Sequence, residues 1–257
     1  MRLNIALRNL VISQIIILLF LIFAYFVWFP HSFLELGGFT KTALMLIFAD
    51  LILGPLLVFI VFKEGKKYLT FDINVLLGIQ IIAFLFGAYS LYLKHPAYAV
   101  FKNDRFILTN VSHLYPQPTL VEQLKSTVFF KPHLVTTHLP DDSQERTNLM
   151  VNVDLFGAPD IEKRPNLFST INDMNAIFEK SINLKSRRLN HQAQQQLELF
   201  FKTHSGTVND YAFLPVIGNN QKSFIWAFNR QSQQPVGLID INPWQLPSEL
   251  IKQAHIN

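Results

Sequence analysis

The chain contains no cysteine, and only 16% of its 257 residues are Asp, Glu, Lys or Arg. The first absence excludes disulfides, zinc–thiolate sites and thiol catalysis. The few charges are missing from whole stretches, since residues 10–29, 51–62 and 73–93 carry none. No basic block interleaved with aromatic residues occurs, so nucleic acid is not a predicted partner. Long uncharged runs in a chain that is 50% hydrophobic instead predict contact with a lipid bilayer.

Three apolar runs have the length that a bilayer requires, about 20 residues. They predict membrane-spanning helices at about residues 10–29, 42–62 and 73–93. The first run is long for a signal peptide and ends in YFVWFPHS rather than in small residues, which favours a retained anchor. The predicted fold class is a membrane protein, in which an N-terminal three-helix transmembrane bundle (residues 1–94) precedes a soluble α+β domain (residues 95–257).

Lysine and arginine are distributed unevenly around these runs. Residues 30–40 carry neither, whereas five lie in the N-terminal segment and in the loop after the second run: Arg2, Arg8, Lys63, Lys66 and Lys67. The positive-inside rule places those two segments in the cytoplasm. Three spans would then place the α+β domain on the other side. The prediction is a multi-pass protein of the bacterial inner (cytoplasmic) membrane, with a cytoplasmic N-terminus and a periplasmic C-terminal domain.

The second part of the chain alternates helix and strand patterns. Residues 97–111 form two short apolar runs around a polar turn, which predicts a β-hairpin. The stretch DDSQERTNLMVNVDLFG predicts a helix between an Asp142 N-cap and Gly157. Thr119 and Glu122 have capping-box spacing. Residues 170–203 are expected to be mostly helical, with a polar break at NLKSRRLN, and residues 212–220, 223–231 and 235–244 predict a meander of strands.

Motifs for catalysis or metal binding are absent from the sequence. His133 and His138 lack the spacing of helical zinc ligands, and no nucleophile elbow or phosphate-binding loop occurs. A dyad of Asp50 and Asp72 is disfavoured, because Asp50 lies about 18 Å from the helix end at which Asp72 sits, counting 1.5 Å per residue. Dyad carboxyls must share a proton. The sequence therefore predicts no enzyme, no cofactor and no small-molecule substrate.

Asp50 remains unusual, because a lone carboxylate in hydrocarbon is costly. It is either a neutral acid that is hydrogen-bonded inside the bundle or a contact for a partner helix. The following Gly54-Pro55 predicts a kink. The third run carries a stripe of small and polar residues that would let another helix approach closely: Gln80, Ala83, Gly87 and Ser90. Together with Asp50, Gly54 and Pro55, these residues are the candidate contact for a transmembrane helix.

Two further groups flank the runs. In the cytoplasmic loop, Lys63, Lys66 and Lys67 are expected to set topology and contact phospholipid, and Asp72 is expected to cap the next helix. In the hairpin VFKNDRF, charged and aromatic residues are expected to anchor the domain against the membrane face: Phe101, Asp104, Arg105 and Phe106. The alternative is an exposed turn pair that contributes less than about 1 kcal/mol.

The stretches DLILGPLLVFIVFKEGKKYLTFD and LLGIQIIAFLFGAYSLYLKHPAYAVFKNDRF resemble the type IV pilin accessory proteins of Gram-negative bacteria. The matching positions are Asp50, Gly54, Pro55, Leu56, Leu57, Phe62, Lys63, Gly65, Lys66, Lys67, Asp72, Gln80, Gly87, Pro96, Tyr98, Phe101, Asp104, Arg105 and Phe106. The resemblance is dense over residues 46–106 and thin over 107–210. One departure is His95, where the family has arginine.

This resemblance implies an inner-membrane accessory protein or chaperone for the assembly or stability of a cognate type IV major pilin. It implies two partners, the pilin and the lipid bilayer. A pilin carries a positive α-amino group at the end of an apolar helix, and Asp50 is a candidate to pair with it. The alternative function is a membrane-anchored extracytoplasmic sensor or adaptor that binds an envelope component. A neighbouring pilin gene would favour the first function, and a neighbouring kinase or sigma-factor gene the second.

Overall fold

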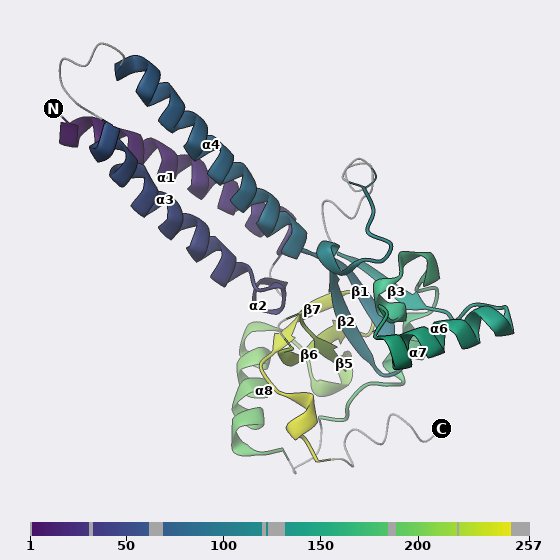
Figure 1. Ribbon diagram of the computed structural model, residues 1–257. Coiled ribbons are helices and arrows are strands. Elements are labelled where there is room, and N and C mark those ends of the chain that lie inside the picture. Colours follow the sequence, from purple (N-terminus) through teal and green to yellow (C-terminus); the bar gives the residue numbers. More distant parts are fainter. Residues whose placement is uncertain are drawn as a thin grey trace.

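The structure is a computed structural model, and it describes residues 2–30, 33–61, 69–119, 122, 132–184, 189–219 and 221–247. Long helices from the N-terminal part of the chain extend away from a sheet-containing domain (Figure 1). We call these helices the helical projection: α1 (Arg2–Val27), α3 (Phe39–Val61) and α4 (Leu69–Lys94). A short helix, α2 (Phe33–Gly37), lies where the projection meets the domain.

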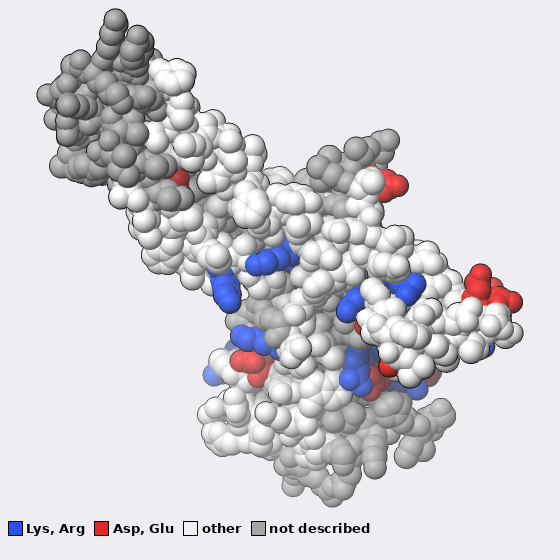
Figure 2. Space-filling model, viewed as in Figure 1, with Lys and Arg blue, Asp and Glu red and all other residues white. Residues whose placement is uncertain are grey.

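The outer surface of the helical projection is apolar. Ile12, Phe48 and Phe86 come from its three helices and are 51%, 55% and 73% exposed. Figure 2 shows the described part of this surface almost without charge, whereas charged side chains gather over the domain. Proteins surrounded by water rarely expose apolar patches of this extent. The surface is therefore compatible with a membrane location.

The prediction of a three-helix transmembrane bundle is wrong. Within the described residues, one helix segment is long and apolar enough to cross a membrane, Asn74–Lys94 of α4. The apolar segment of α1, Val11–Val27, is shorter. Apolar content alone did not reveal this, because apolar residues of the projection also pack against one another: Ile17, Leu21 and Ala24 of α1 share a buried cluster with Leu46 of α3 and Leu91 of α4. The predicted soluble α+β domain is present.

A seven-stranded mixed sheet forms the centre of the domain, in the order β4-β3-β1-β2-β5-β6-β7. Its strands are β1 (Pro96–Lys102), β2 (Arg105–Asn110), β3 (His133–Thr137), β4 (Phe168–Thr170), β5 (Tyr211–Ile217), β6 (Ser223–Asn229) and β7 (Pro235–Ile239). The predicted hairpin is confirmed as β1–β2, and the predicted meander as β5–β6–β7. The sequence did not predict the parallel pairing of β2 with β5, which joins the hairpin to the meander. It also did not predict the parallel pairing of β1 with β3, which adds β3 and β4 to the sheet.

Two helices pack against the sheet, α7 (Met174–Phe178) and α8 (His191–Thr203). A third helix, α6 (Ser143–Phe156), lies at the periphery of the domain (Figure 1). Short 3₁₀ turns connect the elements: η1 (Val111–His113), η3 (Ile161–Lys163), η4 (Pro165–Leu167), η5 (Val208–Asp210) and η6 (Pro243–Gln245). Both predicted ends of α6 are confirmed, because Asp142 Oδ1 accepts the Glu145 N–H at 2.8 Å and Gly157 is left-handed with φ 65°. In the stretch 170–203, which was predicted to be mostly helical, the described residues form α7 and α8, and residues 179–184 and 189–190 are not helical.

The helical projection is packed firmly onto the domain at its base. From α2, Phe33 packs edge-on against Trp226 of β6, with 5.4 Å between ring centroids. Gly37 lies so close to Phe29 that a Cβ would be 2.7 Å from its ring, so a larger residue has no room there. His95, at the position where the resembling family has arginine, is fully buried, and its ring stacks on Trp28. This base is therefore closely packed.

Candidate functional site

A groove of about 110 Å³ opens between α1 and α4, with α3 as its floor. α3 packs closely along both neighbours. The groove is lined by Ile12, Ser13, Ile16, Ile17, Asp50, Leu77, Gln80, Ile81 and Phe84. Phe84 of α4 also meets Phe20 of α1 edge to face, with 5.3 Å between ring centroids. The walls of the groove are mostly apolar, and its few polar groups are concentrated around one acid.

Asp50 is the acidic residue of this groove, and α1 positions it. Its Oδ2 accepts hydrogen bonds from Ser13 Oγ at 2.6 Å and from Gln14 Nε2 at 2.8 Å. Among the described residues, no hydrogen bond or ion pair reaches its Oδ1. The side chain is half-buried. Two donors thus orient the carboxylate, and one oxygen is left to accept a further donor from the groove, where a cation would offset the cost of a charge in apolar surroundings.

The predicted stripe on α4 is divided among different contacts. Gln80 lines the groove together with Asp50. Gly87 packs against α3, because a Cβ there would overlap Cδ1 of Leu46. Ala83 is exposed, and Ser90 Oγ donates to the carbonyl of Phe86 at 2.8 Å within its own helix. The structure therefore joins Asp50 with Gln80 in one groove and uses Gly87 for packing inside the chain.

Other candidate positions lie near the far end of the projection. α3 continues as one helix through Gly54 and Pro55. α4 begins at Leu69, so Asp72 falls in its first turn. The predicted cytoplasmic-loop residues Lys63, Lys66 and Lys67 lie outside the described residues. The role of each remains a prediction.

The candidate hairpin residues lie at the end of β1 that is remote from α4. β1 starts directly after α4, and its seven residues lead to the Asn103–Asp104 turn, about 20 Å away at 3.3 Å per residue. Arg105 pairs with Asp104 at 2.6 Å, and its guanidinium lies 4.2 Å from the centre of the Trp244 ring. Phe106 is fully buried in the sheet core. These contacts are made within the domain.

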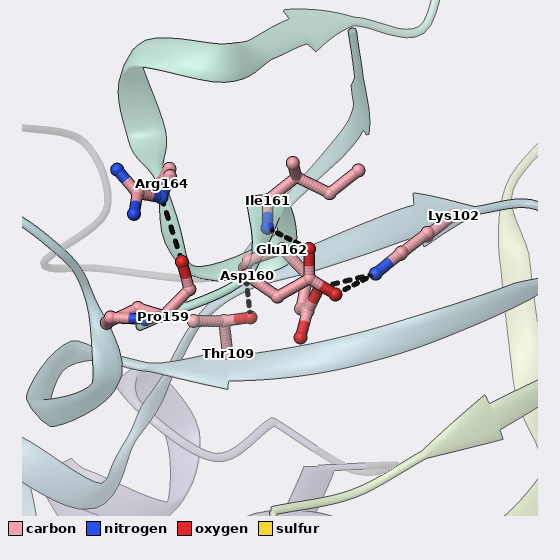
Figure 3. A network of polar contacts seen from close by, with 7 residues as sticks. All are labelled: Lys102, Thr109, Pro159, Asp160, Ile161, Glu162 and Arg164. Carbon is pink, nitrogen blue, oxygen red and sulfur yellow. Dashed lines mark hydrogen bonds and ion pairs between the residues drawn. The ribbon is translucent and has the colours of Figure 1, made fainter. Parts of the chain in front are cut away.

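The sequence analysis missed one polar network, in which Lys102 of β1 joins two carboxylates from η3 and the residue before it (Figure 3). Its ammonium pairs with Asp160 and, at 2.9 Å, with Glu162. Burial would lower the pKa of Lys102, but these two hydrogen bonds raise it above its ordinary value. Burial would likewise raise the pKa of Asp160, but Lys102 and the Ile161 N–H lower it. No local spacing signals a contact between residues 58 positions apart.

Lys102→Met should lower the free energy of unfolding by about 1–2 kcal/mol at pH 7, since two carboxylates lose their partner and only part of the network is screened by water. In the wild type, Asp160 contributes stability above its unfolded pKa of about 4, and this contribution is lost as pH falls through its lowered folded pKa. Lys102 contributes below its unfolded pKa, and this contribution is lost as pH rises through its raised folded pKa.

Thermal unfolding at pH 7 and at about pH 3 checks both statements. The Lys102→Met protein should melt lower at pH 7 and should lose less stability than the wild type on acidification, because its Asp160 no longer has a lysine partner. Lys202→Met is the matched control. Lys202 is exposed on α8, so this substitution removes a positive charge and leaves the Lys102 network intact. If the variant and the wild type lose the same stability between pH 7 and about pH 3, the pairing of Asp160 with Lys102 does not account for the acid sensitivity.

Comparisons with known proteins support the family resemblance. The chain is 25% identical to the fimbrial assembly protein, serogroup I, of Dichelobacter nodosus over 209 residues, which are 79% of this chain and 80% of that protein. The serogroup E1 protein is 26% identical over the same shares. The protein of serogroups C1 and C2 is 34% identical over 82 residues, 31% of this chain and 63% of that protein. No family model and no solved structure matches.

These relatives define the class of protein to which the chain is related, the fimbrial assembly proteins. The chain is homologous to them along most of its length. The resemblance to a type IV pilus assembly family is thereby confirmed.

Proposed function

We propose that this chain acts in type IV pilus biogenesis as an accessory protein or chaperone that supports the assembly or stability of a cognate major pilin. The general role is supported by relatives whose names state fimbrial assembly and which align with 79% of this chain. The proposal assigns the chain a binding role without catalysis. The resemblance over residues 46–106 supports the same function.

The observation that carries the finer proposal is the groove between α1 and α4. Its apolar walls suit an apolar side chain of a partner helix, and Asp50 is held there by Ser13 and Gln14 through one of its carboxylate oxygens. In the proposed complex, the N-terminal helix of the pilin lies along this groove and its α-amino group pairs with Asp50. A paired charge in an apolar environment costs far less than a lone one. Gln80 lines the same groove and is positioned to contact the incoming helix.

The proposed location is the bacterial inner membrane, with the sheet domain on the periplasmic side. Two observations support it. The segment Asn74–Lys94 of α4 is long and apolar enough to cross a bilayer, and it leads directly into β1. The residues that precede α4 include Lys63, Lys66 and Lys67, and such clusters are typical of the cytoplasmic side.

A strain that lacks this chain should carry few or no surface pili, and complementation with the intact chain should restore them. Sheared pili measured by immunoblot give the readout. Pilin messenger RNA should stay at the wild-type level, because an accessory protein acts on the pilin itself. Unchanged piliation in the deletion strain would contradict the proposed function. A loss of pilin messenger RNA would instead favour a sensor or adaptor.

A further inference from the structure

The helix α6 stands apart from the rest of the domain. It lies at the periphery in Figure 1, and Leu149 is the one buried residue among its 14 positions. By comparison, α8 buries Ala193, Leu197 and Phe200 against the sheet. A polar gap of about 510 Å³ lies beside α6, lined by His138, Pro140, Glu145, Asn148, Leu149, Asn152, Arg164, Asn166 and Leu167. The inner side of α6 therefore contributes little to the core.

Large apolar side chains occupy the outer surface of α6. Leu155 and Phe156 are each 75% exposed, and Met150 and Val151 are 47% and 40% exposed. Val151 and Leu155 lie four residues apart and share one helix face. The helix is capped by Asp142 and ended by Gly157, so these side chains belong to a well-formed helix. Exposed apolar clusters with polar surroundings mark binding surfaces.

The segment that contains α6 is acidic. Residues 141–156 contain Asp141, Asp142, Glu145 and Asp154 against the single Arg146, four acids and one base, so their net charge is −3. Asp154 lies next to Leu155, whereas the other three acids lie at the opposite end of the helix, about 14–20 Å away at 1.5 Å per residue. The guanidinium of Arg146 is engaged with the carbonyl of Pro140 at 3.0 and 3.2 Å. Figure 2 shows acidic side chains at the outer end of this region. Anionic lipid would be repelled by this charge, which favours a protein partner with basic residues.

We propose that α6 is a second docking surface, which binds an apolar patch ringed by lysine or arginine on the part of the pilin subunit outside the membrane. This inference rests on the proposed function and extends it, since it gives the pilin a contact that is separate from the Asp50 groove. Leu155 and Phe156 enter the apolar patch. Asp154, next to Leu155, pairs with one of these basic residues, and the acidic N-terminal end of α6 orients the subunit.

Photo-crosslinking in the native membrane tests this inference. A benzoylphenylalanine placed at Phe156 should form an adduct with the pilin, and one placed at Leu199, which is 52% exposed on α8, should not. The double variant Leu155→Ser, Phe156→Ser should weaken pilin co-isolation by about tenfold or more, because exposed apolar anchors dominate such interfaces. Leu199→Ser is the matched control and should not change it. Asp154→Lys should weaken co-isolation at low salt and have less effect at high salt.

The possible outcomes separate this inference from the proposed function. If the deletion strain loses its pili but no pilin adduct forms at Phe156, the α6 inference fails and the function stands. An adduct between two copies of this chain would also overturn the inference, in favour of self-association. If the deletion strain keeps its pili, the function itself fails. The melting temperature of each serine variant should match the wild type, because the replaced side chains are exposed.

Discussion

Asp50→Asn should leave the protein abundant and folded but strongly reduce the number of surface pili. Asparagine keeps a side-chain oxygen that can accept from Ser13 and Gln14, so the helical projection should keep its packing. It removes the charge that is proposed to pair with the α-amino group of the pilin. Loss of one partner of a desolvated charge pair costs about 2–5 kcal/mol, which corresponds to more than tenfold in affinity.

Two measurements decide the Asp50 prediction: an immunoblot of this protein and the yield of sheared pili. Ser13→Ala is the matched control, because it removes one donor to Oδ2 and keeps the carboxylate. That variant should assemble pili near the wild-type level. Normal piliation with Asp50→Asn would contradict charge pairing. If the immunoblot shows that the Asp50→Asn variant does not accumulate, Asp50 has a role in folding instead.

Gly87→Val should destabilise the helical projection. A Cβ at this position would overlap Cδ1 of Leu46, which is buried between α3 and α4. Overpacking of this kind costs about 1–3 kcal/mol, and the melting temperature of a chain of this size should fall by about 2–12 °C. The variant should also assemble fewer pili. Separation of α3 from α4 would move Asp50 away from Gln80 in the groove.

The chain offers both a control and a coupled double variant for Gly87→Val. Gly78 lies on the same helix with nothing within 4 Å of its built Cβ, so Gly78→Val should change the melting temperature little. Leu46→Ala removes a buried side chain and is itself destabilising, but it opens space beside position 87. The double variant should therefore lose less stability than the sum of the two single losses. Measurement in detergent gives the melting temperatures. Additive losses in the double variant would show that Leu46 is not the obstacle.

The candidate site could be predicted only in part. A charge within an apolar run is conspicuous in any sequence, which is why Asp50 was found. Its actual partners, Ser13 and Gln14, lie 37 and 36 residues away on α1 and carry no local signal. Gln80 does share the groove, whereas Gly87 of the same predicted stripe packs against Leu46. Helical spacing predicts that residues share a face, but the neighbouring helix decides what that face contacts.

The sequence by itself determined the local structure. The ends of α6, the β1–β2 hairpin and the β5–β7 meander all depend on nearby residues, through capping, turn formation and alternation along a strand. These interactions are short in the chain, so their patterns are visible in it. Asn103 adopts the left-handed φ of 62° that the hairpin turn requires.

The tertiary structure alone decided the parallel pairings in the sheet and the Lys102 network. It also decided which surfaces of the apolar helices are buried within the chain. Each depends on contacts between segments that are far apart in the chain, such as β2 with β5 or Lys102 with Asp160. Apolar residues predict that a segment is removed from water, but they do not show whether lipid or another part of the chain covers it. In α1, Ile17 and Ala24 are buried against other parts of the chain, while Leu19 and Phe26 remain exposed. Among the described residues, the three apolar runs therefore contain one candidate span, Asn74–Lys94, and two helices that pack beside it.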